Sequence, residues 1–260
     1  MSEPKVLFEN IDGVGVIRLN APETANAMDL EIGEALLAAL ITAESDPEIK
    51  VVVLTGNGRT FSAGANFKAI KRELAENSGQ TADMIFYRFV GAFHKAVAVM
   101  IGMQKPTMAA VNGTAAGGGL ALALACDLVV ASDQARFDPV YVRLGLVPMG
   151  GLTRLLPMLL GPKHAMEFLL MAKPVSAMRA EKMGLVNVVV DHEDLLDRTI
   201  YTARKIMKHP GDGVGQTKRL LWGSPQDLEK RLSEEAEALR QCSQAPETKA
   251  IWDALLKGQK

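Results

Sequence analysis

The sequence has few of the residues that would tie it to a charged partner or to an oxidising compartment. Its 260 residues carry 29 Lys and Arg against 30 Asp and Glu, so the formal net charge is −1 at pH 7. This balance gives no basic field to attract nucleic acid or a membrane surface. Cys126 and Cys242 are the only cysteines, too few and too far apart for a disulfide framework or a metal cluster. We therefore expect reduced thiols, no metal, and no nucleic-acid or membrane partner.

Charged residues are also missing between Pro106 and Cys126, a stretch as long as a membrane span. Asn112, Thr114 and a run of glycines interrupt it, and a bilayer would leave such irregular backbone without hydrogen bonds. We interpret the stretch as a buried strand, loop and helix. The N-terminal residues are charged and contain no apolar block, so we expect no secretory signal and a cytoplasmic location.

Apolar residues recur with the periods of strands and helices. Residues 5–11 and 14–20 alternate around Asp12-Gly13, which predicts a β-hairpin. Asp29 is a predicted cap for a helix that runs to about Ser45. Further strands are predicted at 50–55, 107–111, 128–131, 135–137 and 187–190, and further helices at 66–76, 81–103, 117–126, 151–160, 162–171, 176–183, 192–208, 213–222, 225–243 and 246–257. Strands concentrate in the first half and helices at the end, which indicates an α/β fold with a C-terminal helical segment.

Two glycine-containing turns, at residues 61–66 and 111–120, are the most informative motifs. Each follows an apolar, strand-like run and leads into a predicted helix. Backbone at such a turn leaves N–H groups without partners, and a helix that begins there adds positive partial charge. Two such turns side by side would form a pocket for an oxygen that becomes negative, as in an enolate. Tight packing of the two turns is the alternative interpretation.

The order and spacing of several short motifs resemble the enoyl-CoA hydratase/isomerase (crotonase) family along nearly the whole chain. These motifs are Phe61-Ser62-Ala63-Gly64-Ala65, Lys105-Pro106, Val111-Asn112-Gly113, Ala116-Gly117-Gly118-Gly119, Ala125-Cys126-Asp127, Leu144-Gly145-Leu146-Val147-Pro148 and Ala180-Glu181-Lys182-Met183-Gly184-Leu185-Val186. The resemblance implies a crotonase-like spiral of ββα units over residues 1–195 and a C-terminal helical trimerisation or cap segment over residues 196–260. It also implies a homotrimer or a hexamer (a dimer of trimers) and an acyl-CoA substrate of fatty acid metabolism. The thioester oxygen would lie between the backbone N–H groups of Ala65 and Gly118.

By the same resemblance, other residues would contact coenzyme A. Asn26-Ala27 and Ala63 match segments that lie against its nucleotide end, and Lys68 and Arg18 are candidates for its phosphates. A solvated side chain is the alternative for either cation. Coenzyme A would be part of the substrate rather than a separate cofactor, and an acyl group on a carrier protein is the alternative form. No dinucleotide or phosphate-loop fingerprint fits the glycines of residues 113–119.

The resemblance fails at the positions where this family carries its acids and bases. Hydratases of the family use two glutamates, and the matching positions here are Ala121 and Tyr141. A third position, an aspartate in the dienoyl-CoA isomerases, matches Met149. General acid–base steps contribute about 100- to 10,000-fold, so efficient hydration is not expected. Tyr141 is the remaining candidate for a proton donor or substrate anchor, with simple packing as the alternative.

Other candidate side chains have weaker support. Asp138 would face the same cavity or end a strand; Asn66 is a predicted helix N-cap; and a lone histidine on a helix, His94, favours a structural or surface role. The helix at 81–103 is rich in aromatic and methionine residues, either as core or as an acyl channel: Met84, Phe86, Tyr87, Phe89, Phe93, Met100 and Met103. The helix at 225–243 has a predicted solvated face with Glu229, Lys230, Arg231, Glu234, Glu235 and Glu237.

The sequence thus predicts an enzyme that stabilises a thioester enolate between Ala65 and Gly118, with Tyr141 as the candidate acid. An isomerase, decarboxylase or other lyase step is favoured over hydration because the glutamate pair is missing. The alternative is a protein that binds acyl-CoA or an acyl carrier without catalysis. The missing carboxylates favour that alternative, and the intact glycine motifs oppose it.

Overall fold

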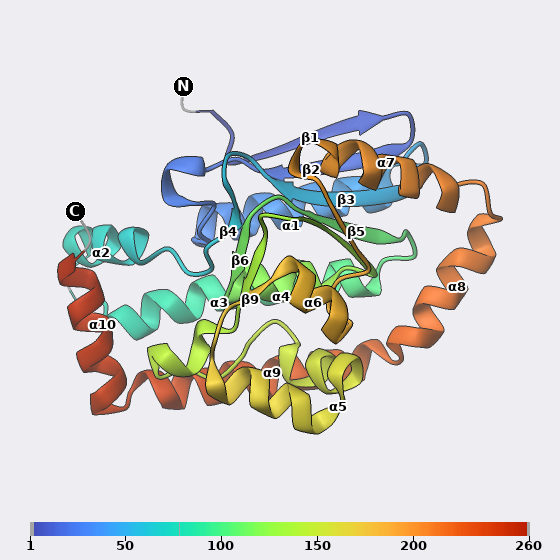
Figure 1. The fold of residues 1–260 in the computed structure, drawn as a ribbon. Coiled ribbons are helices and arrows are strands. Elements are labelled where there is room, and N and C mark those ends of the chain that lie inside the picture. Colours follow the sequence, from blue (N-terminus) through green and yellow to red (C-terminus); the bar gives the residue numbers. More distant parts are fainter. Residues whose placement is uncertain (1–2, 78, 259–260) are drawn as a thin grey trace.

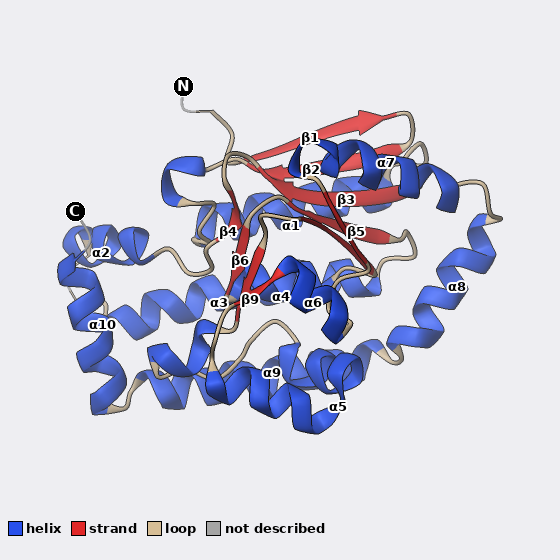
Figure 2. Cartoon of the chain, viewed as in Figure 1, coloured by secondary structure: helices blue, strands red, loops and turns tan. Residues whose placement is uncertain are grey.

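Two sheets of unequal size form the centre of the molecule (Figure 1). The computed structural model describes residues 3–77 and 79–258. The larger sheet has the strand order β1 (Val6–Ile11), β2 (Val14–Leu19), β3 (Val51–Gly56), β5 (Thr107–Val111), β7 (Leu128–Ser132) and β10 (Val188–Val190). The smaller sheet has the order β4 (Thr60–Ser62), β6 (Thr114–Ala116), β8 (Arg136–Asp138) and β9 (Val175–Ser176). Figure 2 shows both sheets with helices packed around them. The α/β class is confirmed.

From β3 to β8, consecutive strands alternate between the two sheets. β3, β5 and β7 are parallel neighbours in the larger sheet, whereas the strands that follow them, β4, β6 and β8, are parallel neighbours in the smaller one. A helix follows the second strand of each pair, so each strand–strand–helix unit adds one strand to each sheet. Two strand pairs in the described part of the chain are antiparallel, β1 with β2 and β8 with β9, and β1 and β2 form the expected hairpin around Asp12-Gly13. The arrangement is the predicted spiral of ββα units.

Helix positions follow the predicted pattern, with two differences. The helices are α1 (Leu30–Ser45), α2 (Phe67–Glu76), α3 (Ala82–Gly102), α4 (Gly118–Ala125), α5 (Leu152–Met171), α6 (Ala177–Met183), α7 (Leu195–Ile206), α8 (Gly211–Trp222), α9 (Pro225–Ser243) and α10 (Pro246–Gly258). The two helices expected at 151–160 and 162–171 are one element with a kink at Gly161, whose φ is 74°. The helix expected from residue 192 begins as a 3₁₀ turn, and α7 proper starts at Leu195.

Short elements were missed where few residues carry the pattern. Strands β4, β6 and β9 have two or three residues each, and 3₁₀ turns occur at Pro22–Thr24 and Val140–Leu144. The uncharged stretch from Pro106 to Cys126 forms β5, β6 and α4 in the core, as the sequence indicated. In the described part of the chain only α3 has the length and composition of a membrane span, and 61% of its apolar window is buried inside the protein.

The C-terminal helices are attached to the core at several points. α7 packs on the larger sheet through Leu195 and Ala203. The carboxylate of Asp127, just before β7, ties α8 to the core. It accepts hydrogen bonds from the main chain of Thr107 in β5 and from the indole of Trp222 in α8, and it forms an ion pair with Lys218 of α8 at 2.9 Å. The division of the chain at 195/196 falls at the first residue of α7, and it stays a prediction.

Gly119 shows how tightly the turn after β6 packs against the turn after β4. A Cβ placed on Gly119 would lie 2.3 Å from the carbonyl oxygen of Ser62, whereas a Cβ on Gly91, in the exposed face of α3, meets nothing within 4 Å. We expect Gly119→Ala to lower the free energy of unfolding by about 1–3 kcal/mol or more, because two backbones must separate. Gly91→Ala is the matched control and should raise it by about 0.5–1 kcal/mol. Urea denaturation measures both, and equal effects at the two positions would contradict this packing.

Candidate functional site

The turns that precede α2 and α4 meet backbone to backbone. A Cβ placed on Gly118 would lie 3.8 Å from the Cα of Gly64. A Cβ on Gly64 would lie 2.8 Å from the carbonyl oxygen of Ala116 and 3.3 Å from the amide nitrogen of Gly118. Gly64 also has a φ of 88°, a conformation that side chains rarely allow. Glycine at residue 64 therefore lets two distant segments of the sequence come into contact, whereas a Cβ on Gly118 would make an ordinary van der Waals contact.

The first turn is fixed by Asn26, whose side chain is fully buried. Its Oδ1 accepts from the amide of Ala21, and its Nδ2 donates to the carbonyl oxygens of Asn57 and Thr60. The carbonyl oxygen of Asn26 accepts in turn from the hydroxyl of Ser62 at 2.8 Å. All side-chain hydrogen bonds of Asn26 thus go to the protein, so any contact of this residue with a ligand would be through its main chain.

The amides of Ala65 and Gly118 are left without acceptors for different reasons. Met28 donates to the carbonyl of Gly64 and accepts from Asn66 in an isolated parallel bridge, so the N–H of the residue between them, Ala65, is directed away from Met28. Gly118 is the first residue of α4, where an N–H has no intrahelical acceptor. Neither amide donates a hydrogen bond to another residue that the structure describes.

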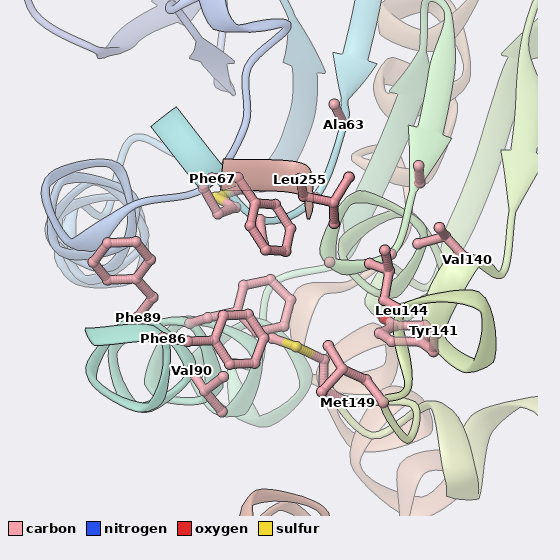
Figure 3. A pocket seen from close by; sticks show the side chains of 18 residues that line it. Ala63, Phe67, Phe86, Phe89, Val90, Val140, Tyr141, Leu144, Met149 and Leu255 are labelled. Carbon is pink, nitrogen blue, oxygen red and sulfur yellow. The ribbon is translucent and has the colours of Figure 1, made fainter. Parts of the chain in front are cut away.

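A cavity of about 210 Å³ adjoins both amides (Figure 3). Its 18 lining residues are Met28, Ala63, Gly64, Ala65, Phe67, Phe86, Phe89, Val90, Phe93, Ala116, Gly117, Gly118, Val140, Tyr141, Leu144, Leu146, Met149 and Leu255. None of the 18 is charged, and the phenol of Tyr141 is the one hydrogen-bonding side chain among them. The polar chemistry of this cavity is therefore limited to main-chain groups and one hydroxyl.

Tyr141 lies on the 3₁₀ turn Val140–Leu144 and is buried. Its hydroxyl has no hydrogen-bond partner in the described part of the molecule. Burial raises the pKa of the phenol well above its usual value, and the carboxylate of Glu235 adds to the shift. At neutral pH the side chain is thus a neutral phenol, which cannot act as a base, and its hydroxyl is buried without a partner among the described residues.

Ala121, Tyr141 and Met149, which the sequence matched to the acid and base positions of the family, carry no carboxylate. Ala121 is buried inside α4 and does not line the cavity, whereas Met149 does. Asp138 ends β8 and accepts from Arg143 at 2.5 Å and 2.6 Å, so it serves a surface ion pair outside the cavity. In residues 3–77 and 79–258, no three His, Cys, Asp or Glu side chains gather as metal ligands would.

Two buried side chains hold the loop that follows Met149. The Nε2 of His94 accepts from the amide of Gly150 at 3.1 Å, and burial lowers the pKa of this imidazole to about 4. The carboxylate of Glu235 accepts from the amides of Gly151 and Thr153 at 2.8 Å and 3.0 Å, and from the Thr153 hydroxyl. Both side chains satisfy N–H groups at the start of α5. The structural role that we favoured for His94 is confirmed.

The prediction of a solvated face on α9 is wrong for Glu235, which is buried. Its spacing from Leu228, Leu232 and Leu239 places all four residues on one helical face. That spacing was the signal in the sequence for a buried Glu235. The neighbouring acidic residues of α9 instead favoured a solvated position for it. Burial also raises the pKa of Glu235, although its hydrogen bonds oppose that shift.

The remaining candidates lie around the mouth of the cavity or behind it. Ala63 is exposed and lines the cavity, whereas Ala27 is buried. Lys68 is exposed on the first turn of α2, which Asn66 caps as predicted by accepting from the amide of Ala69. Arg18 pairs with Glu9 at 2.8 Å. The structure thus brings Ala63, Ala65, Gly118 and Tyr141 together, and the roles of Asn26, Ala27 and Lys68 stay predictions.

α3 and α10 both contribute apolar side chains to the cavity lining. Phe86, Phe89 and Phe93 line the cavity, as the acyl-channel interpretation requires, whereas Met84 and Tyr87 are exposed and Met100 and Met103 lie in the core. Leu255 of α10 also lines the cavity, a contribution that the sequence analysis missed. Nothing local to α10 marks Leu255, because its role arises from the packing of α10 on α2 and on the 3₁₀ turn.

Known proteins resemble this chain in sequence and in fold. The family model described as enoyl-CoA hydratase/isomerase matches residues 9–253. 4-Chlorobenzoyl coenzyme A dehalogenase-2 of Arthrobacter sp is 34% identical over 230 residues, which cover 88% of this chain and 82% of that protein. Probable enoyl-CoA hydratase EchA12 of Mycobacterium tuberculosis is 36% identical over 229 residues, 88% of this chain and 80% of its own. A solved enoyl-CoA hydratase from Bacillus halodurans superposes with a TM-score of 0.87 at 26% identity, covering 96% of this chain and 99% of that one.

The hydrogen bond between His94 and Gly150 makes a prediction for stability. Protonation of His94 ends its role as acceptor, and its pKa is about 4 in the folded protein against about 6.5 for an unperturbed histidine. The unfolded chain therefore binds the proton first, and stability falls as the pH drops from about 6.5 to 4, by up to about 3 kcal/mol from this group. His94→Gln keeps an acceptor that does not titrate, so its unfolding free energy should depend less on pH over that window. Urea denaturation from pH 7.5 to 4 measures this, with the exposed-residue change His209→Gln as a control that keeps the wild-type slope.

Proposed function

The chain belongs to the enoyl-CoA hydratase/isomerase family, and we propose that it forms a thioester enolate by losing a group from the α-carbon, with decarboxylation as the step that its site supports best. It is an acyl-CoA enzyme of the crotonase family. One observation supports the proposed step above all others: among the described residues that line the cavity, the only hydrogen-bonding side chain is a neutral, unpartnered phenol. A site with a proton donor and no base suits an enolate that arises without proton removal.

We assign the amides of Ala65 and Gly118 to the thioester oxygen. Negative charge develops on that oxygen as the enolate forms, and two fixed N–H donors stabilise it without reorganisation. Each such donor is worth about 3–4 kcal/mol of transition-state stabilisation in enzymes where it has been removed. The free amides and the contact between Gly64 and Gly118 support this assignment.

Decarboxylation needs only the groups that this cavity offers. In a 2-carboxyacyl thioester the bond between Cα and the carboxylate breaks, CO₂ leaves, and the electron pair passes to Cα and the thioester oxygen. Tyr141 then gives its proton to Cα, and the phenolate regains a proton from water. A carboxylate among uncharged apolar side chains is poorly stabilised, whereas the enolate oxygen lies against two donors, so the reaction moves charge to where the protein accepts it.

Hydration and double-bond shifts require a base, and the described residues that line the cavity do not provide one. Water addition needs a group to activate the water, and isomerisation needs one to remove a proton from carbon. Tyr141 stays protonated because burial raises its pKa. The same shortage favours, as the second candidate, a protein that binds acyl-CoA or an acyl carrier without turnover.

We also propose that the chain assembles as a homotrimer or as a dimer of trimers. Large apolar side chains are exposed on two helices, which supports burial against further copies. On α5 they are Met158, Leu159, Met166, Leu170 and Met171, and on α8 they are Leu220 and Leu221, both 73% exposed. These two helices contribute no lining residue to the acyl cavity, which is lined from α2, α3, α10 and the 3₁₀ turn.

Turnover in heavy water distinguishes the two candidate functions. We expect malonyl-CoA and methylmalonyl-CoA to release CO₂ and the thioester products to carry one deuterium at Cα, because Tyr141 exchanges its proton with solvent. Crotonyl-CoA and 3-hexenoyl-CoA should be neither hydrated nor isomerised at a comparable rate. Mass spectrometry and CO₂ release measure these outcomes. Binding of all four thioesters without any turnover would favour the non-catalytic protein, and faster hydration would exclude the proposed step.

Tyr141→Phe tests the proton donor. Loss of the hydroxyl should lower kcat by about 100-fold or more, the usual effect of removing a general acid. The control Tyr87→Phe removes a phenol hydroxyl from an exposed position on α3 and should leave kcat unchanged. In the wild type, kcat should not fall between pH 7 and 9 through ionisation of Tyr141, because its pKa is raised. Unchanged turnover in Tyr141→Phe would assign the residue to packing.

Lys68→Ala tests the contact with the phosphates of coenzyme A. The side chain is exposed on α2, next to the turn that carries Ala65. We expect KM for a CoA thioester to rise about 2- to 5-fold, in the range of an exposed ion pair, and the effect to shrink in high salt. KM for the matching pantetheine thioester, which has no nucleotide, should stay the same. Lys163→Ala on α5 is the control. An equal rise in KM for both thioesters would contradict a contact between Lys68 and the phosphates of coenzyme A.

A further inference from the structure

Four phenylalanine rings form one side of the acyl cavity. Phe67 comes from α2, and Phe86, Phe89 and Phe93 come from successive turns of α3. Figure 3 shows Phe67, Phe86 and Phe89 across the cavity from Val140, Leu144 and Tyr141. Aromatic rings bind another ring well, through edge-to-face or offset contacts that add to the burial of apolar area.

The aromatic wall is held in place by Trp252 of α10. Its ring makes edge contacts with Phe67 and Phe86, with centroids 5.7 Å and 5.1 Å apart. The Trp252 Nε1 donates to the carbonyl oxygen of Leu144 at 3.2 Å, which ties the aromatic wall to the 3₁₀ turn that carries Tyr141. Because these contacts fix the aromatic wall, it cannot close around a small ligand. A ligand that leaves part of the apolar cavity empty therefore binds less favourably.

The size of the cavity limits the ligand. Its volume is about 210 Å³, and an apolar cavity of about 150 Å³ in another protein binds benzene. The space therefore suits a ring-sized group together with the thioester carbon. A long straight chain would need more room than this volume gives, and α10 contributes Leu255 to the cavity lining. A charged substituent beyond the departing carboxylate would find no partner among the lining residues.

We propose that the substrate carries a compact, ring-sized apolar substituent on the carbon that bears the departing carboxylate, as in a benzylmalonyl thioester. This inference rests on the proposed decarboxylation. The substituent lies among Phe67, Phe86, Phe89 and Phe93, and the thioester oxygen lies against Ala65 and Gly118. The bond between Cα and the carboxylate breaks, CO₂ leaves, Tyr141 protonates Cα, and a 3-arylpropanoyl thioester is the product.

A substrate series on the wild-type protein tests the proposal. We expect kcat/KM for benzylmalonyl-CoA to exceed that for malonyl-CoA and for decylmalonyl-CoA by about 10-fold or more, since a single methylene already contributes about 10- to 200-fold in an apolar pocket. Calorimetry should show that 3-phenylpropanoyl-CoA binds more tightly than acetyl-CoA. CO₂ release with malonyl-CoA or decylmalonyl-CoA at an equal or higher kcat/KM would overturn the substrate class and leave the decarboxylation intact. Absence of CO₂ from every thioester would instead overturn the proposed function on which the inference rests.

Variants of Val90 locate the substituent within the cavity. Val90 lines the cavity from α3, so Val90→Phe should lower kcat/KM for benzylmalonyl-CoA about 10-fold or more and change that for malonyl-CoA less. Val90→Ala should shift the preference toward larger substituents. Val99→Ala makes the same change on the same helix outside the cavity and should keep the wild-type preference. Turnover of malonyl-CoA reports whether each variant is folded, and an unchanged ratio of the two substrates in both Val90 variants would contradict the proposal.

Discussion

The contact between Gly64 and Gly118 is the constraint on which the site depends. It brings the turn that follows β4 against Gly118, the first residue of α4, with no side chain between the two backbones. The bridge of Met28 to the first turn and the helix start at the second turn leave one amide free on each side. The buried side chain of Asn26 supports this arrangement by hydrogen bonds to three backbone groups. The two sheets, which receive alternate strands, place the two turns side by side.

The chemistry around these amides is defined by neutral groups. The titratable side chains His94 and Glu235 do not line the cavity, and their hydrogen bonds go to the loop of residues 150–153. Tyr141 is the exception, and burial keeps it protonated. An apolar cavity with fixed donors at one end separates two tasks: aromatic side chains select the ligand by shape, and main-chain groups stabilise charge. This separation supports the proposed enolate chemistry at a site whose described lining residues carry no carboxylate.

The sequence predicted the parts of this molecule that depend on local patterns. The hairpin at Asp12-Gly13, the cap at Asp29 and the long helix α3 follow from turn chemistry and periodicity, and the order of the glycine motifs identified the turns at Ala65 and Gly118. Features that depend on tertiary packing were not predictable in the same way. The two-residue strand β9 has too few residues for a pattern, and Leu255 reaches the cavity only because α10 folds back over α2. Glu235 was misplaced because its charge outweighed the spacing of its leucine neighbours.

The proposed anion site consists of main-chain donors, and substitutions affect such donors differently from catalytic side chains. A point mutation can delete a catalytic acid by changing one side chain, but no codon removes the N–H of Ala65 or Gly118 short of proline. What a mutation can add is bulk, and at Gly64 a single methyl group would lie 2.8 Å from the carbonyl of Ala116 and force the two turns apart. Substitutions of the other lining residues can therefore change the side-chain chemistry of the cavity, while the proposed main-chain anion site stays in place as long as residue 64 is glycine.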